Sequence, residues 1–138
     1  MKELFVLDAC GLIAFLGDEP GAKAIEILLR RALLKDCEIY MHIINLLEVY
    51  YGIYREDGKD KGDEIYNKVT NLPITIIGRL TEEHIKEAGR LKATYKISLA
   101  DSIILAYGRL NNAKITTSDH HEFDIIDKSK EVSFYWFR

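Results

Sequence analysis

The chain has 138 residues and a formal net charge of −3, with 48% hydrophobic and 30% charged residues. This composition excludes a disordered polypeptide and is typical of one globular domain, so we expect a single domain over residues 1–138. The acidic balance means that nucleic acid would have to be bound through local basic patches. No segment is long and uncharged enough to span a membrane, and two isolated cysteines, Cys10 and Cys37, indicate free thiols in a reducing, cytoplasmic setting.

Short apolar runs alternate with helical patterns along the chain. In chain order, the pattern predicts strands over 4–7, 38–43, 74–77, 114–117 and 132–136, and helices over 11–16, 22–35, 45–55, 63–71, 82–95 and 98–111. The charged segment 56–62 is interpreted as a turn between two helices. This alternation predicts an α/β fold with a central parallel sheet of about five strands and helices on both faces.

Four acidic residues stand far apart in the chain, each beside an apolar segment: Asp8, Glu48, Asp101 and Asp119. Two of them directly follow predicted strands, and the other two are expected near helix starts. In a parallel sheet the ligand crevice lies beyond the carboxyl ends of the strands, so the four carboxylates are expected to meet there. Carboxylates that lie together raise each other's pKa unless a cation separates them. Four oxygen ligands suit Mg²⁺ or Mn²⁺, which points to phosphodiester chemistry.

Helix capping offers a simpler explanation for three of these acids. Ser98-x-x-Asp101, Asn45-x-x-Glu48 and Asp119-x-x-Glu122 each have the form of a capping box. Asp8 is harder to explain in this way, because Asp is a poor strand former and Ala9-Cys10-Gly11 offers no evident partner for its side chain. Capping and metal binding therefore both remain open for Glu48, Asp101 and Asp119.

The order of these motifs resembles the PIN domain family, and within it the VapC-type toxins. The resemblance rests on Phe5-Val6-Leu7-Asp8, Asn45-Leu46-Leu47-Glu48, Ser98-Leu99-Ala100-Asp101-Ser102 and Thr116-Thr117-Ser118-Asp119, with Phe123 following. The family often has Thr or Ser at the position of Asn45. The extra acids Glu122 and Asp124 leave open which of them accompanies Asp119.

The resemblance implies a single PIN-like nuclease domain whose metal-binding acids are Asp8, Glu48, Asp101 and Asp119. It implies a Mg²⁺- or Mn²⁺-dependent endoribonuclease, with RNA as substrate, a cognate antitoxin as partner and a homodimer as the usual assembly. Thr117 and Ser118 are expected to contact phosphate or to support the ligands, with Glu122 and Asp124 as further candidates. The alternatives are a PIN nuclease in RNA processing and a non-catalytic PIN-fold binding protein.

Other features support less specific interpretations. His120-His121 lacks the further His or Cys that a zinc site needs and is interpreted as a polar turn. Tyr50, Tyr51 and Tyr54 are expected to pack in the core or at a dimer interface rather than to stack on bases. The first predicted strand is followed by neither G-x-G-x-x-G nor a second acid two residues after Asp8. This argues against a dinucleotide-binding domain and a haloacid-dehalogenase-type phosphatase.

Overall fold

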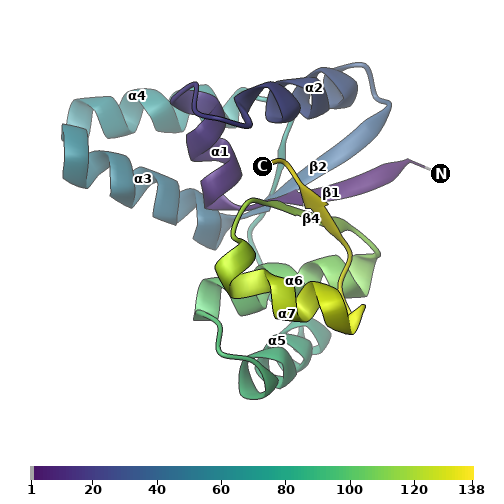
Figure 1. Ribbon diagram of the computed structural model, residues 1–138. Coiled ribbons are helices and arrows are strands. Elements are labelled where there is room, and N and C mark those ends of the chain that lie inside the picture. The colour runs from purple at the N-terminus through teal and green to yellow at the C-terminus, as the bar shows by residue number, and fades with distance from the viewer. Residues whose placement is uncertain (1) are drawn as a thin grey trace.

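A computed structural model describes residues 2–138 and shows one parallel sheet of five strands in the order β3-β2-β1-β4-β5. The elements in chain order are β1 (Glu3–Leu7), α1 (Ala9–Leu16), α2 (Ala22–Leu33), β2 (Cys37–His42), α3 (Ile43–Asp57), α4 (Lys59–Thr70), β3 (Thr75–Ile77), α5 (Glu82–Thr94), α6 (Leu99–Asn111), β4 (Lys114–Thr117), α7 (His120–Ser129) and β5 (Phe134–Trp136). The predicted fold class, an α/β domain with a five-stranded parallel sheet, is confirmed (Figure 1).

Helices cover both faces of the sheet, and the central strand β1 shows why. Alternate side chains of a strand point to opposite faces, so Phe5 and Leu7 join one apolar core while Val6 joins the other. The first core is completed by α1 to α4 and the second by α5 to α7, which form the two helical layers in Figure 1. Burial on both faces explains why β1 has no polar alternation.

The carboxyl ends of the strands meet at one edge of the sheet. Leu7 at the end of β1 pairs with Thr116 of β4, and His42 at the end of β2 pairs with Ile77 of β3. The residue that follows β1 and the loop that follows β4 therefore lie next to each other. This edge is where the predicted acids were expected to meet.

The structure corrects two parts of the predicted element order. The segment after β4 was interpreted as a polar turn at His120-His121, but it forms helix α7, because Phe123 and Ile126 are buried against the second core. The charged segment 56–62 was interpreted as a turn, but α3 continues to Asp57 and α4 begins at Lys59. Gly58 alone separates the two helices, and its φ of 92° lies in the region that glycine adopts without strain.

The paired helices α3 and α4 extend away from the sheet together with their connecting turn (Figure 1). Ile65 and Val69 of α4 are buried against Leu46 and Val49 of α3 in the first core. Within residues 2–138, none of the helices combines the length and the apolar character that crossing a bilayer requires.

Candidate functional site

Asp8 follows β1 directly and is the N-cap of α1. Its Oδ1 accepts a hydrogen bond of 2.8 Å from the Gly11 backbone N–H, so the expectation that this side chain has no local partner is wrong. A Cβ at Gly11 would lie 2.6 Å from Leu7 Cδ1, and the absence of a side chain there lets the first turn of α1 close over the strand end. Only 6% of Asp8 is exposed, which is unusual for a carboxylate.

Asp101 and Asp119 reach the same edge from α6 and α7. The predicted cap of α6 is confirmed, because Ser98 Oγ accepts a hydrogen bond of 3.1 Å from the Asp101 N–H. Asp119 is the N-cap of α7, where its Oδ1 accepts a bond of 3.1 Å from the Glu122 N–H. Both acids therefore stand at the start of a helix, where the helix dipole favours negative charge. Each is partly exposed, so both have access to a ligand from solvent.

Glu48 differs from the prediction in its local role. The N-cap of α3 is His42, whose Nδ1 accepts a bond of 3.2 Å from the Ile44 N–H, so Asn45 is not a cap. Asn45 lies inside the helix and is buried, and its Nδ2 donates a bond of 2.9 Å to Glu48 Oε1. The amide of Asn45 thereby holds one oxygen of an otherwise exposed carboxylate in a defined orientation.

The charges of these acids act on one another although the chain separates them widely. Burial raises the pKa of Asp8 to about 6, and the charges of Asp101 and Asp119 add to the increase. Burial likewise raises the pKa of Asp101 to about 6, with further contributions from Asp119, Glu48 and Glu122. Asp8 thus feels the charges of Asp101 and Asp119, and Asp101 also feels those of Glu48 and Glu122. We call these five residues the acidic site.

Asp124 is excluded from the acidic site by its own contacts. Its Oδ1 lies 2.8 Å from His120 Nδ1, and the same imidazole reaches the Arg138 carbonyl through Nε2 at 3.0 Å. The His120 ring is also stacked on Trp136, with ring centroids 4.0 Å apart. Both ring nitrogens of His120 are occupied, so this residue is not placed as a metal ligand.

The last residue of β4 and the β4–α7 loop supply hydroxyl groups beside the carboxylates. The Thr117 hydroxyl accepts a bond of 3.1 Å from the Asp119 N–H, and its contact with the Asp8 carboxyl partly offsets the rise in the pKa of that group. Ser118 Oγ lies 3.0 Å from Cys10 Sγ and accepts a bond of 3.2 Å from Arg138 Nη2. Sequence reasoning missed Cys10 and Arg138 as neighbours of this loop, and only the position of Cys10 shortly after Asp8 could have indicated the contact.

The donors of the acidic site suit a hydrated divalent cation. Within residues 2–138, no three His, Cys, Asp or Glu side chains form a group that could hold an ion by themselves. Mg²⁺ commonly keeps several waters and takes only one or two carboxylates directly, together with substrate phosphate oxygens. A divalent cation is most stabilising beside a buried carboxyl whose pKa is raised by burial and, to a smaller extent, by other carboxylates. That Asp8, Asp101 and Asp119 hold such an ion stays a prediction.

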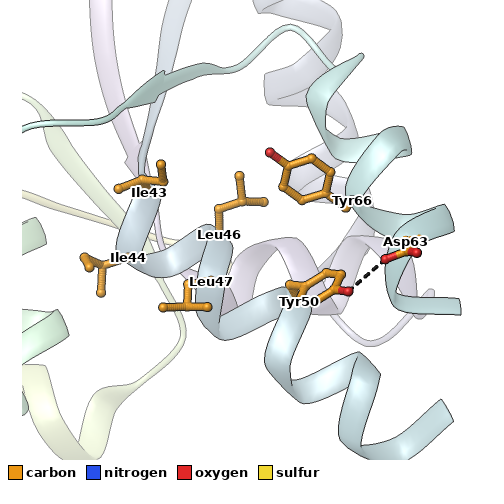
Figure 2. A pocket seen from close by; sticks show the side chains of 7 residues that line it. All are labelled: Ile43, Ile44, Leu46, Leu47, Tyr50, Asp63 and Tyr66. Atoms are coloured by element: carbon orange, nitrogen blue, oxygen red, sulfur yellow. Dashed lines mark hydrogen bonds between the residues drawn. The ribbon is translucent and has the colours of Figure 1, made fainter. Parts of the chain in front are cut away.

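The largest cavity described lies between α3 and α4 and begins at Ile43, directly after the end of β2. It has a volume of about 520 Å³ and is lined by Ile43, Ile44, Leu46, Leu47, Tyr50, Asp63 and Tyr66. Figure 2 shows Leu46 of α3 pointing toward Tyr66 of α4, and the Tyr50 hydroxyl donating a bond to Asp63, which is 2.8 Å long. Tyr50 is half-buried, as expected for packing, while Tyr51 and Tyr54 are exposed. We call this surface the α3–α4 groove.

Solved structures of VapBC and VapC proteins have the same fold. VapBC2 from Rickettsia felis, bound to a promoter DNA fragment, is 17% identical with a TM-score of 0.73, covering 96% of this chain and 98% of its own. VapBC-1 from nontypeable Haemophilus influenzae is 15% identical with a TM-score of 0.72, covering 97% and 98%. VapC20 of Mycobacterium tuberculosis, a Sarcin-Ricin loop cleaving toxin, is 12% identical with a TM-score of 0.59, covering 81% and 85%.

At these identities the likeness establishes the fold and leaves the activity open. No curated protein matches the sequence. The PIN domain family, however, matches residues 5–129, which include every acid of the acidic site. The sequence match, the parallel sheet and the position of the acids at its carboxyl edge agree, and the chain belongs to the PIN domain family.

Proposed function

We propose that this protein is a Mg²⁺- or Mn²⁺-dependent endoribonuclease and the toxin component of a type II toxin–antitoxin system. The observation that carries the proposal is the buried carboxyl of Asp8, which lies within the electrostatic reach of Asp101 and Asp119 at the edge of the sheet. Such a group costs folding free energy, so its natural explanation is a bound cation. RNA as substrate is supported by the shared fold with a Sarcin-Ricin loop cleaving toxin.

The acids have different roles in the proposed reaction. Asp8, Asp101 and Asp119 would hold the cation, and Glu48, oriented by Asn45, would contact it directly or through water. When bound, the cation activates the attacking water and stabilises the charge that develops on the phosphate and the leaving oxygen. The partly exposed Ser118 hydroxyl is proposed to contact the phosphate, and the buried Thr117 hydroxyl to keep Asp8 in position. We expect a 5′-phosphate and a 3′-hydroxyl as products, as in water-attack metallonucleases.

The proposed partner is a cognate antitoxin that binds the α3–α4 groove. Similar structures are toxin–antitoxin complexes, and this groove is both the roomiest cavity described and a mostly apolar one. Leu47 and Ile43 are separated by one helical turn on α3 and are 59% and 46% exposed, which suits an apolar stripe on a partner helix. The expected homodimer and the cytoplasmic location stay predictions, and light scattering of the purified protein measures the former.

The test of the activity compares structured and unstructured RNAs incubated with Mg²⁺, with Mn²⁺ and with chelator. The wild type should cleave only with metal, and Asp8→Ala should not cleave under any condition. Expression in a bacterial host should arrest growth, and the same substitution should relieve the arrest. Cleavage without growth arrest would favour a PIN nuclease of RNA processing. Absence of cleavage across all substrates and both metals would favour a non-catalytic binding protein.

A further inference from the structure

A second cavity lies beside the acidic site, between the end of α5 and the first turns of α7. It has a volume of about 380 Å³ and is lined by Thr94, Tyr95, Lys96, His121, Glu122 and Ile125. A volume of this order is within the range of small-ligand pockets. We call it the α5–α7 cavity.

The α5–α7 cavity and the acidic site share a wall. Glu122 lines the cavity, and its backbone N–H is bonded to Asp119 Oδ1, an oxygen of the acidic site. The Glu122 charge also contributes to the raised pKa of Asp101. An RNA strand bound at the acidic site would therefore have the α5–α7 cavity directly beside it.

The side chains around the α5–α7 cavity suit a nucleotide. Lys96 is exposed and forms no ion pair with the residues from 2 to 138, whereas Arg90 of α5 is engaged by Glu87 and Glu131. His121 is exposed and makes no side-chain hydrogen bond in that part of the chain. A free cation beside aromatic rings is the combination that binds single-stranded nucleic acid, through phosphate contact and base stacking.

The walls of the α5–α7 cavity are held in place before any ligand binds. The hydroxyl of Tyr95 donates to Glu131 and orients the ring. The loop that carries Lys96 is fixed by Lys92, whose Nζ donates a bond of 2.8 Å to the Ile97 carbonyl. His121 is fixed at its backbone by the first turn of α7. Little ordering of the protein is therefore needed on binding, which favours affinity.

We propose that the α5–α7 cavity is the subsite for the RNA nucleotide that flanks the bond to be cut, with Lys96 on its phosphate and Tyr95 and His121 stacking on its base. The assignment rests on the proposed ribonuclease function and extends it to a second set of residues. Glu122 limits the affinity of this subsite for a phosphate in the absence of metal, because it places a like charge on the cavity wall. The subsite thus has a cationic end and an end that faces the acidic site.

The test measures binding without cleavage. A fluorescein-labelled single-stranded RNA is titrated with protein in chelator, and anisotropy is followed over a range of salt concentrations. Lys96→Ala should lower the slope of log K against log salt by about 0.7, the value for one phosphate contact with a single strand. Lys128→Ala, which removes an exposed lysine at the far end of α7, is the matched control and should leave the slope unchanged.

Ring substitutions separate stacking from charge. Tyr95→Leu and His121→Ala should each weaken binding about fivefold or more, as loss of one stacked base does. Tyr95→Phe keeps the ring and loses only the hydroxyl contact with Glu131, so it should bind RNA more tightly than Tyr95→Leu. Glu122→Gln should bind RNA more tightly than the wild type. Circular dichroism and thermal melting of each variant exclude unfolding as the cause, and Lys96→Arg should restore the salt slope.

The outcomes for the subsite and for the ribonuclease activity are distinguishable. If the wild type cleaves RNA but Lys96→Ala, Tyr95→Leu and His121→Ala bind it as Lys128→Ala does, the subsite assignment is overturned while the activity stands. If the wild type does not cleave RNA but Lys96→Ala, Tyr95→Leu, His121→Ala and Glu122→Gln change RNA binding in chelator as expected, the α5–α7 cavity is an RNA-binding site and the proposed ribonuclease activity is wrong. A wild type that shows no RNA binding in chelator at low salt overturns the subsite.

Discussion

Replacement of Asp8 by asparagine should stabilise the metal-free protein. Burial and the neighbouring carboxylates raise the pKa of Asp8 from 3.8 to about 6. The folded state then binds this proton more tightly than the unfolded state, so the contribution of the group to stability is present below pH ~4 and is lost as the pH rises through ~6. Above both values the ionised carboxyl costs roughly 3 kcal/mol of unfolding free energy.

Asparagine removes this cost and keeps the cap, since its Oδ1 can accept the Gly11 N–H bond that Asp8 accepts. Part of the gain is offset because the amide NH₂ loses the favourable contact that Thr117 makes with a carboxyl oxygen. We therefore expect Asp8→Asn to gain about 1–3 kcal/mol near pH 8 and close to nothing near pH 4.

Urea unfolding in chelator at the two pH values measures the difference. Asp60→Asn, an exposed acid in the first turn of α4, is the control for net charge, and its effect should be a loss of less than about 1 kcal/mol at both pH values. Added Mg²⁺ should stabilise the wild type and not Asp8→Asn. The reasoning is refuted if Asp8→Asn unfolds at a lower urea concentration than the wild type near pH 8, with the Asp60→Asn protein behaving as stated.

Three further predictions follow from the same geometry. Asp101→Asn should abolish RNA cleavage, while its free energy of unfolding stays within about 1 kcal/mol of the wild type because Ser98 still caps α6. Urea unfolding and the cleavage assay measure the two effects. If the variant still cleaves RNA, Asp101 has no role beyond the start of the helix. The affinity for Mg²⁺ should fall as the pH decreases through about 6, because protons then compete with the metal for Asp8 and Asp101. Calorimetric Mg²⁺ titrations at several pH values measure this affinity. An affinity that stays constant between about pH 5 and pH 8 would contradict the prediction. Leu47→Lys should weaken antitoxin binding by at least tenfold without loss of RNA cleavage, because it places a charge in the α3–α4 groove. The matched control is Leu33→Lys, at a 70% exposed position on α2. If the two variants bind the antitoxin with equal affinity, the groove is not part of the interface.

The sequence was sufficient where the structural information is local. The apolar run at β1 predicted a buried strand. The caps at Ser98 and Asp119 could also be predicted, because their hydrogen bonds join residues three apart in the sequence. Gly58 shows the limit of this reasoning: charged residues around it favoured a turn of several residues, whereas a single glycine joins α3 to α4. Helix α7 was missed for a related reason, since its polar start gives no periodic signal until Phe123 and Ile126 find the second core.

Asn45 illustrates what the sequence pattern could not assign. Its spacing to Glu48 suggested a helix cap, but the capping group is His42, three residues earlier, and the amide of Asn45 instead orients the Glu48 carboxylate. A cap at Asn45 and a side-chain bond from Asn45 to Glu48 both fit this spacing of three residues. Only the position at which α3 begins distinguishes the two.

The sequence by itself determined the order of the strands, the parallel α/β class and the identity of the four candidate acids, because apolar runs and polar strand ends are properties of neighbouring residues. Only the tertiary structure decided that Asp8 is buried, that the charges of Asp101 and Asp119 act on it, and that Glu122 joins them while Asp124 does not. It also placed Lys96 and His121 on either side of one cavity. The physical reason is that burial and like-charge repulsion depend on distances through space, which residues far apart in the chain acquire only when the sheet and its two helical layers have assembled.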